Sequence, residues 1–152
     1  MVNAAQTKEA IKTMRTCGSC TKCCEGWVAG QARDSHFYPG VPCDYLADNG
    51  CSIYKSRPEH PCQSFVCEWL VDRSISYYMK PDKSCIILIR RKINDIEYVE
   101  MAEAGQPLSA SALEWFLRAY ISGKYDNISY RIHNHPRYIG TAEFITAMEK
   151  QQ

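Results

Sequence analysis

The stretch that decides the fold reads Cys17-Gly18-Ser19-Cys20-Thr21-Lys22-Cys23-Cys24. Two thiolates separated by two residues can reach one metal ion, because the turn between them directs both sulfur atoms to the same point. The neighbours Cys23 and Cys24 are hard to aim at one small ion without strain. They therefore either serve two adjacent centres, or one of them is spare.

Further cysteines follow along the chain at Cys43, Cys51, Cys62 and Cys67. Eight thiolates are twice the number that closes a tetrahedral zinc site or holds one iron–sulfur cluster. We therefore expect metal binding through the set Cys17, Cys20, Cys23, Cys24, Cys43, Cys51, Cys62 and Cys67. The sequence does not say which four of them would share an ion.

A disulfide framework and a set of unrelated core thiols are the alternatives to a metal site. The segment from Met1 to Arg15 is polar and charged, without the apolar stretch of a signal peptide, so we expect a cytosolic protein with reduced thiols. Vicinal cysteines also bridge poorly. The ninth cysteine, Cys85, opens an apolar run and is expected to be a small buried hydrophobe.

Around the cysteines, from residue 16 to 65, periodicity is weak and turn formers are frequent, as in Tyr38-Pro39-Gly40 and Asp48-Asn49-Gly50. Such a stretch cannot bury enough apolar surface to fold alone and needs cross-links. Before it, a short helix is expected over about residues 4–14.

Periodic patterns dominate the rest of the chain. They predict strands over 85–89, 96–101 and 128–132, a turn at 93–95, and helices over 109–122 and 141–150. Ser111 with Glu114 fits a capping box for the first of these helices, and Gly123 fits its end. The expected fold is α+β, with an irregular cysteine-rich lobe (1–70) packed on a small antiparallel sheet with helices (71–152). At 152 residues, both lobes are expected to form one compact domain.

The cysteine pattern resembles the CxxCxxCC family. The resemblance rests on residues 17–24, on Cys43, on Cys51-Ser52-Ile53-Tyr54-Lys55-Ser56-Arg57-Pro58, and on Cys62 and Cys67, and it covers about residues 16–70. Members are described as zinc- or iron-chelating domains, and flagellin lysine N-methylases are related to them. The resemblance implies metal chelation through these eight positions and implies no reaction. The chain shows no Gly-rich loop after a first strand, which a methyltransferase would need, and we identify no catalytic residue.

Zinc, at about two ions, is the favoured metal, because the ligands sit in short turns and closed four-sulfur zinc sites are common folding staples. An iron–sulfur cluster remains the alternative, since all eight ligands are soft thiolates. Zinc would make the lobe a structural element that offers a surface to a macromolecular partner. Iron would point to a redox or protein-methylation accessory activity.

The net charge of +1 gives no global basic field for nucleic acid or an acidic membrane. With eight thiolates and two divalent ions the charge becomes about −3, which argues further against phosphate binding. No apolar run is long enough to span a bilayer.

Several other side chains near the cysteines invite a role. Arg57 is expected to donate hydrogen bonds to carbonyl or thiolate groups, with Tyr54 and Phe65 packing over the metal loops. His60 could replace one sulfur ligand, and His133 with His135 could bind metal or move protons, although a surface loop is the commoner outcome for such a pair. Trp69 and Trp115 are expected in the core.

Overall fold

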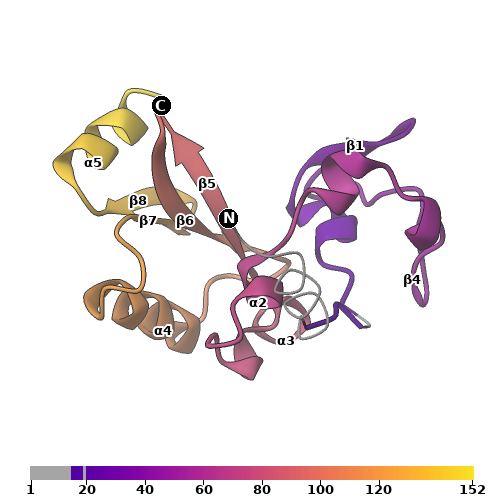
Figure 1. The fold of residues 1–152 in the computed structure, drawn as a ribbon, viewed down its shortest axis with the longest axis horizontal. Coiled ribbons are helices and arrows are strands. Elements are labelled where there is room, and N and C mark those ends of the chain that lie inside the picture. Colours follow the sequence, from indigo (N-terminus) through magenta and orange to yellow (C-terminus); the bar gives the residue numbers. More distant parts are fainter. Residues whose placement is uncertain (1–14, 19) are drawn as a thin grey trace, which may run out of the picture.

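The computed structural model describes residues 15–18 and 20–152, so the helix expected over about 4–14 lies outside the described residues. The α+β class is confirmed: helices pack on one four-stranded sheet, and two small hairpins lie in the cysteine-rich part (Figure 1). Among the described residues, no helix is both long and apolar enough to cross a bilayer.

The four-stranded sheet has the order β5-β6-β7-β8, formed by β5 (Ile86–Ile93), β6 (Ile96–Glu103), β7 (Ile128–Ile132) and β8 (His135–Ile139). β5 pairs with β6, and β7 with β8, in antiparallel register. β6 and β7 run parallel, so the sheet is mixed. Parallel strands cannot be joined by a two-residue turn and need a longer crossover connection. Here the connection from β6 to β7 contains a helix, Ala110–Ile121.

Two tight turns close the hairpins. Asn94 and Asp95 have φ angles of 47° and 64°, and His133 and Asn134 have 47° and 65°. Left-handed conformations at both central residues match the twist of the flanking strands, and Asn and Asp tolerate them. The first turn lies where the sequence predicts it. The second hairpin was not predicted, because Pro136 interrupts the strand pattern; here Pro136 sits on the edge strand β8, where a missing N–H is tolerated.

Helices α4 (Ala110–Ile121) and α5 (Ala142–Glu149) begin at hydroxyl caps. Ser109 Oγ accepts a hydrogen bond from the Ala112 N–H, and Thr141 Oγ1 accepts one from the Phe144 N–H. The capping box expected at Ser111 and Glu114 is wrong, because the cap is Ser109. Glu114 instead pairs with Arg118 one turn along the helix, at 2.9 Å. Gly123, with φ of 84°, follows the end of α4 as predicted.

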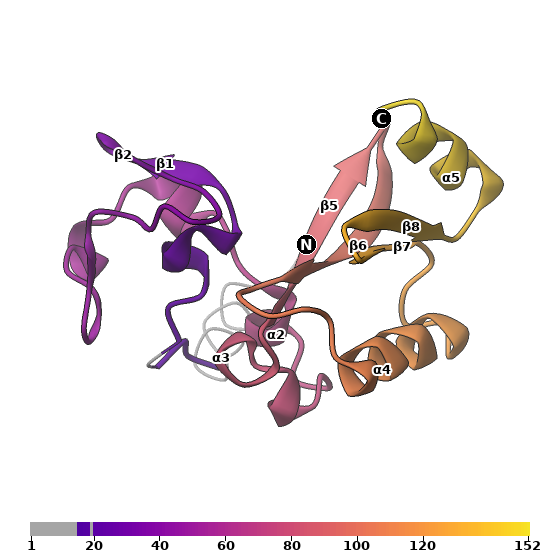
Figure 2. The same cartoon turned by 180° about the vertical axis from the view of Figure 1, so that it is seen from behind.

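The two helices cover opposite faces of the sheet (Figures 1 and 2). Phe116 of α4 meets Tyr130 of β7 edge to face, with ring centroids 6.3 Å apart. Phe144 of α5 packs against Tyr98 of β6 and Tyr138 of β8. Both phenylalanines are fully buried, and the main cluster of buried residues, on the α4 side and around β5, has seventeen members. Trp69 is buried in it and Trp115 packs against it, as expected.

The cysteine-rich part is built from short pieces. A helical turn, η1 (Cys23–Trp27), precedes the hairpin of β1 (Gly30–Ala32) and β2 (Ser35–Phe37). A second hairpin, of β3 (Leu46–Ala47) and β4 (Gly50–Cys51), leads to the turns η2 (Tyr54–Ser56) and η3 (Glu59–Gln63). Among the described residues of this part, a small separate buried cluster consists of Ala32, Phe37 and Cys43, with Tyr45 and Cys62 packed against it.

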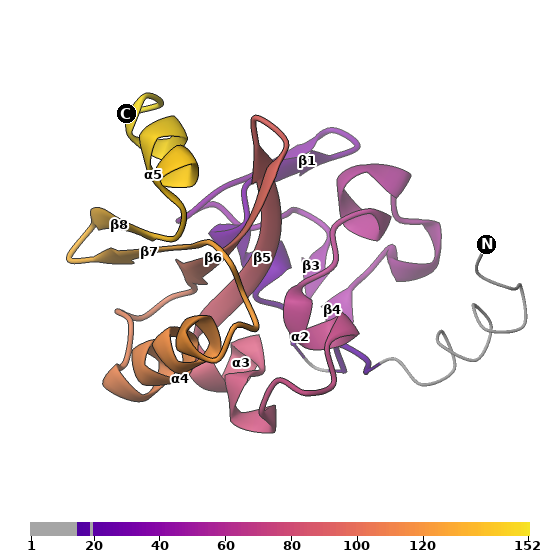
Figure 3. The ribbon, with the colours of Figure 1, turned by 60° about the vertical axis from the view of Figure 1, so that its left-hand side comes forward.

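The junction between the two parts is formed by α2 (Glu68–Val71), followed by η4 (Tyr77–Met79) and α3 (Pro81–Ser84) (Figure 3). Cys67 and Trp69 belong to the main buried cluster, and Trp27, Val28 and Phe65 of the cysteine-rich part pack against it. The buried Glu68 carboxylate accepts hydrogen bonds from Nε and Nη2 of Arg90, both at 3.1 Å. Apolar contacts and this ion pair therefore hold the cysteine-rich part against β5.

Cys85 differs from the expectation. It lies between α3 and β5, adopts a left-handed conformation with φ of 56°, and is only partly buried. Its position at the helix end, rather than inside the strand, leaves the side chain partly open to solvent.

Candidate metal centres

All nine cysteines are free thiols in this structure, and all of them lie in its described part. Cys43 and Cys67 are buried, and the other six members of the predicted ligand set are partly buried. Thiols that are withdrawn from water but not bonded to one another are available as metal ligands, provided that their sulfur atoms lie near one another.

Four of the predicted ligands, Cys17, Cys20, Cys23 and Cys67, are neighbours at the junction with the core; we call them the inner group. Burial raises the pKa of Cys67 to about 11, and the charges of Cys17 and Cys20 add to this effect. Hydrogen bonds from the backbone N–H groups of Leu70 and Trp69 lower the pKa in part. Burial also raises the pKa of Cys17, followed by the charge of Cys20. Burial also raises the pKa of Cys23, followed by the charges of Cys24, Cys17, Cys67 and Cys20. Because repulsion between thiolates weakens with distance, these thiols lie within electrostatic range of one another.

Backbone contacts explain why the inner group assembles. The Cys20 N–H donates to the Cys17 carbonyl at 3.0 Å across a turn. Arg15 then fixes the chain just before this turn: its guanidinium donates to the carbonyls of Trp69 at 3.2 Å and Ile75 at 2.7 Å, and lies over the Trp69 ring at 4.3 Å. These contacts bring the first two cysteines close to Cys67, which directly precedes α2.

The remaining four ligands, Cys24, Cys43, Cys51 and Cys62, are neighbours within the cysteine-rich part; we call them the outer group. Burial, followed by the charges of Cys51, Cys43, Cys62 and finally Cys17, raises the pKa of Cys24 to about 11. The pKa of Cys62 is raised by burial and then by Cys43 and Cys51.

The outer group also has backbone reasons to assemble. The Cys43 N–H donates to the Cys24 carbonyl at 2.9 Å, and the Cys43 carbonyl accepts from the Leu46 N–H at 3.0 Å. Leu46 is paired with Cys51 across the β3–β4 hairpin. Cys62 packs beside Cys43 on the small cluster of Ala32 and Phe37.

These sulfur atoms do not yet form a coordination shell. Among residues 15–18 and 20–152, no group of three or more His, Cys, Asp or Glu side chains is placed so that it could hold a metal ion. The donor types fit a thiophilic metal, but the sulfur atoms of a group would have to draw closer together around an ion.

Two cations lie beside the thiols. The charges of Arg57 and Lys80 both lower the pKa of Cys17, against the larger effect of burial, and Arg57 also lowers that of Cys62. Lys80 is buried, and its Nζ lies 3.5 Å from Asp82 Oδ2. The same nitrogen approaches Gly18, since a Cβ atom added to that glycine would be 3.6 Å from it. Arg57 thus lies near both groups, whereas Lys80 lies near the inner one.

Within residues 15–18 and 20–152, the Arg57 guanidinium does not donate the hydrogen bonds expected of it. Its guanidinium stacks on the Tyr54 ring at 4.0 Å, and its influence on the thiols is through charge. Tyr54 is more than half exposed, so it does not shield the cysteines as expected. Phe65 does pack against the main cluster, at the junction.

Two buried indole groups lie close in sequence to members of the inner group. In the described part of the chain, the N–H groups of Trp27 and Trp69 are buried without an acceptor. Trp27 ends the helical turn that begins at Cys23, and Trp69 lies two residues beyond Cys67. An indole nitrogen can only donate, and sulfur can accept weakly.

The histidines are not gathered at either group. His60 is exposed, with Nδ1 2.7 Å from the Ser64 hydroxyl. His133 forms the turn of the β7–β8 hairpin, and His135 begins β8 opposite Ile132. His133 and His135 therefore lie at an exposed hairpin end, which agrees with the surface loop that is the commoner outcome for such a pair.

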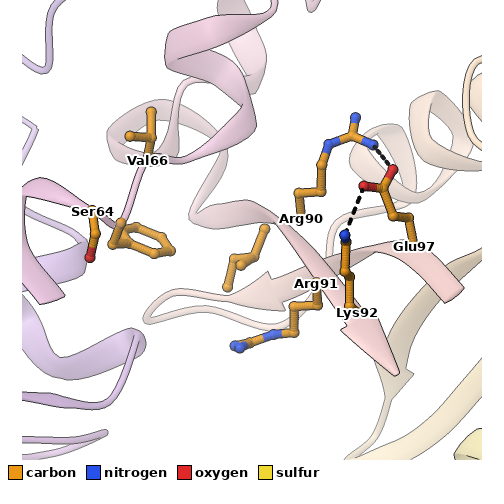
Figure 4. Close-up of a pocket in the computed structure, with 8 residues that line it drawn as sticks. Ser64, Val66, Arg90, Arg91, Lys92 and Glu97 are labelled. Atoms are coloured by element: carbon orange, nitrogen blue, oxygen red, sulfur yellow. Dashed lines mark ion pairs between the residues drawn. The ribbon is translucent and has the colours of Figure 1, made fainter. Parts of the chain in front are cut away.

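A groove of about 350 Å³ lies between residues 64–66 and β5 (Figure 4). Its walls are Phe65 and Val66 on one side and Arg90, Arg91 and Lys92 on the other. The cations are paired: Arg91 with Glu100, and both Arg90 and Lys92 with Glu97. The groove is thus nearly neutral and contains no cysteine.

Sequence reasoning identified the thiols but missed the cations Arg15 and Lys80, which come close to the thiols only through the fold.

In comparisons with known proteins, no family model, no curated protein and no solved structure matches this chain.

Proposed function

We propose that this chain is a metal-binding protein in which zinc, at about two ions, is held by the eight thiolates and keeps the cysteine-rich part folded. The observation that carries the proposal is a mismatch: eight free thiols, all at least partly buried, lie in a region whose own buried apolar cluster has three members. A region with so small a core needs another source of stability.

Bound metal would supply that stability. A structural zinc ion contributes on the order of 10 kcal/mol in model peptides, comparable to the net stability of a whole domain. It would also resolve the electrostatics of the groups. Burial and mutual repulsion disfavour neighbouring thiolates, and a divalent cation reverses this by binding the deprotonated form. Arg57 and Lys80 would offset part of the remaining negative charge.

The motif supports the same ligand set. The cysteine pattern resembles that of the CxxCxxCC family, for which metal chelation through these positions is implied. A reducing compartment such as the cytosol would keep the thiols available.

Exposed apolar side chains suggest how the folded region is used. Of the eight large hydrophobic residues that are exposed in the described part of the chain, seven lie between residues 38 and 78, among them Tyr38, Tyr54, Tyr77 and Tyr78. Tyrosine is enriched at the energetic centres of protein interfaces. The metal-stabilised region and the adjoining junction would therefore together present a surface to a macromolecular partner, and a protein fits the composition of this surface better than nucleic acid does.

Elemental analysis of protein purified without oxygen tests the proposal. The expected result is about two zinc atoms per chain, with none after Cys-to-Ser substitution of all eight positions and an unchanged value for Cys85→Ser. Metal-free protein that retains the secondary structure of β1–β4 would contradict it.

An iron–sulfur protein with a redox or methylation accessory activity is the second candidate, favoured by the all-thiolate ligand set. The same preparation distinguishes it: iron with acid-labile sulfide and visible absorption replace zinc.

A further inference from the structure

We propose that the eight thiols form two separate four-sulfur centres, with the inner group Cys17, Cys20, Cys23 and Cys67 as one and the outer group Cys24, Cys43, Cys51 and Cys62 as the other. This division rests on the proposed function, since it assigns the ligands of those two ions. Its least expected feature is that the adjacent residues Cys23 and Cys24 serve different ions.

The backbone around the vicinal pair separates the two side chains. Both residues begin the helical turn η1, where consecutive side chains point in different directions. The Cys24 carbonyl accepts a hydrogen bond from the Cys43 N–H, which holds Cys24 beside the segment that leads into β3. At the other end of the turn, Trp27 packs on the main buried cluster to which Cys67 belongs. The hydrogen bond therefore assigns Cys24 to the same centre as Cys43, and the remaining thiol of the pair, Cys23, is left for the inner centre.

Each group also contains a ligand that packs in or against a different buried cluster. Cys67 is held by the main cluster and by the Arg15 contacts to Trp69 and Ile75. Cys62 packs on the small cluster beside Cys43. The preceding residue, Pro61, lies close to β1: a Cβ atom added to Gly30 would be 3.1 Å from its ring. Since Cys62 and Cys67 are only five residues apart in sequence, their assignment to different clusters is a property of the fold.

The two centres would have unlike tasks. The inner centre joins the start of the cysteine-rich part to Cys67 at the junction, beside Trp27 and Trp69, and so fixes this part against the core. The outer centre joins only segments within the cysteine-rich part.

Cadmium-113 is the probe that reads this assignment directly. The unaltered full chain is loaded with ¹¹³Cd²⁺, and proton–cadmium correlation spectra connect each ion to the β-protons of its cysteines. Two cadmium resonances are expected, one connected to the inner group and the other to the outer group, with no cysteine in common. A cysteine connected to both ions, or any other grouping, overturns the division while leaving metal binding by the eight thiols intact. A chain that binds no cadmium overturns the division and the proposed function together.

Substitutions of the vicinal pair give an independent readout. In a Cys62→Ser background, where one ion is expected to remain, addition of Cys24→Ser should leave that ion in place, because the outer centre is already lost. Addition of Cys23→Ser should remove it as well. Zinc per chain, with Cys85→Ser as the control that retains both ions, distinguishes the two. Equal metal content in the two double variants, or the opposite order, contradicts the division.

Discussion

The strand–helix part and the cysteine-rich part of this protein are stabilised in different ways. The main buried cluster has seventeen members and lies among the sheet, α4 and the junction, whereas the cluster of the cysteine-rich part has three. Burial of apolar surface is sufficient to explain the first part. The second has short strands, turns and partly buried thiols instead, and under the proposed function its stability comes from metal ions that join cysteines far apart in the sequence. The comparison teaches that the two parts should respond differently to the same perturbation.

Among substitutions outside the eight cysteines, truncation of a core aromatic in the strand–helix part should have the largest effect. Phe116 is fully buried between Tyr125 and Tyr130, so Phe116→Ala should lower the free energy of unfolding by about 3–5 kcal/mol. Urea unfolding followed by circular dichroism measures the change. Ile121→Ala, at a position on the same helix that is 80% exposed, is the control and should change stability by less than about 0.5 kcal/mol. Equal effects would show that α4 is not packed as described.

The junction should be sensitive to the ion pair between the buried Glu68 and the half-exposed Arg90. Glu68→Ala removes both acceptors of the Arg90 guanidinium and should cost about 2 kcal/mol, because hydrogen bonds to charged groups are stronger than neutral ones. Glu97→Ala is the matched control: its contacts to Arg90 and Lys92 are longer, at 3.7 and 3.8 Å, and exposed. That change should cost less than about 1 kcal/mol in the same unfolding experiment. A larger loss for Glu97 than for Glu68 would contradict the assignment of the junction contact.

The helix caps should contribute less. Ser109→Ala and Thr141→Ala each remove the acceptor of one N–H group at a helix start and should cost about 1 kcal/mol. Ser111→Ala, at the position that the sequence alone favours as the cap, should leave stability nearly unchanged. Thermal unfolding of the three variants decides between Ser109 and Ser111; destabilisation by the Ser111 change alone would restore the capping box.

The smallest effect is expected at the ion pair between Asp72 and Lys124, whose atoms are 2.6 Å apart at the surface. Although partial burial opposes it, the pKa of Asp72 is lowered below 3.8 by hydrogen bonds from Lys124 and Ser74. Its contribution to stability is therefore fully present above the ordinary pKa and is lost as the pH falls through the lower value of the folded chain. Lys124→Met should raise the pKa of Asp72 and cost less than about 1 kcal/mol at neutral pH. Carboxyl NMR titration measures the shift, and an unchanged pKa would contradict the pairing.

Most of the strand–helix part could be predicted from the sequence because its elements carry local signals. The β5–β6 hairpin, α4, β7 and α5 all lie where apolar periodicity and turn residues place them. β5 runs further than expected, through Arg90-Arg91-Lys92, because pairing with β6 continues regardless of side-chain polarity. β8 was missed because it is an edge strand containing Pro136, and the parallel β6–β7 pair because strand order is a non-local property.

In the candidate site, the residue types could be predicted and their grouping could not. Spacing identifies Cys17 and Cys20 as partners, because one turn joins them. No local sequence signal places Cys67 beside them, or Cys43 beside Cys24. Cys67 is brought near by the Arg15 contacts, and Cys43 by the hydrogen bond from its N–H to the Cys24 carbonyl. Lys80 carries no local signal at all, since it reaches the thiols from the segment between η4 and α3.

The central claim is that metal, rather than apolar burial, holds the cysteine-rich part together. Amide hydrogen exchange, measured peptide by peptide on the metal-loaded chain and again after chelation, tests it most directly. The account predicts that protection of β1–β4 and the segments between them is lost on chelation, while β5–β7 and α4 keep theirs. Unchanged protection of β1–β4 after verified metal removal would contradict it.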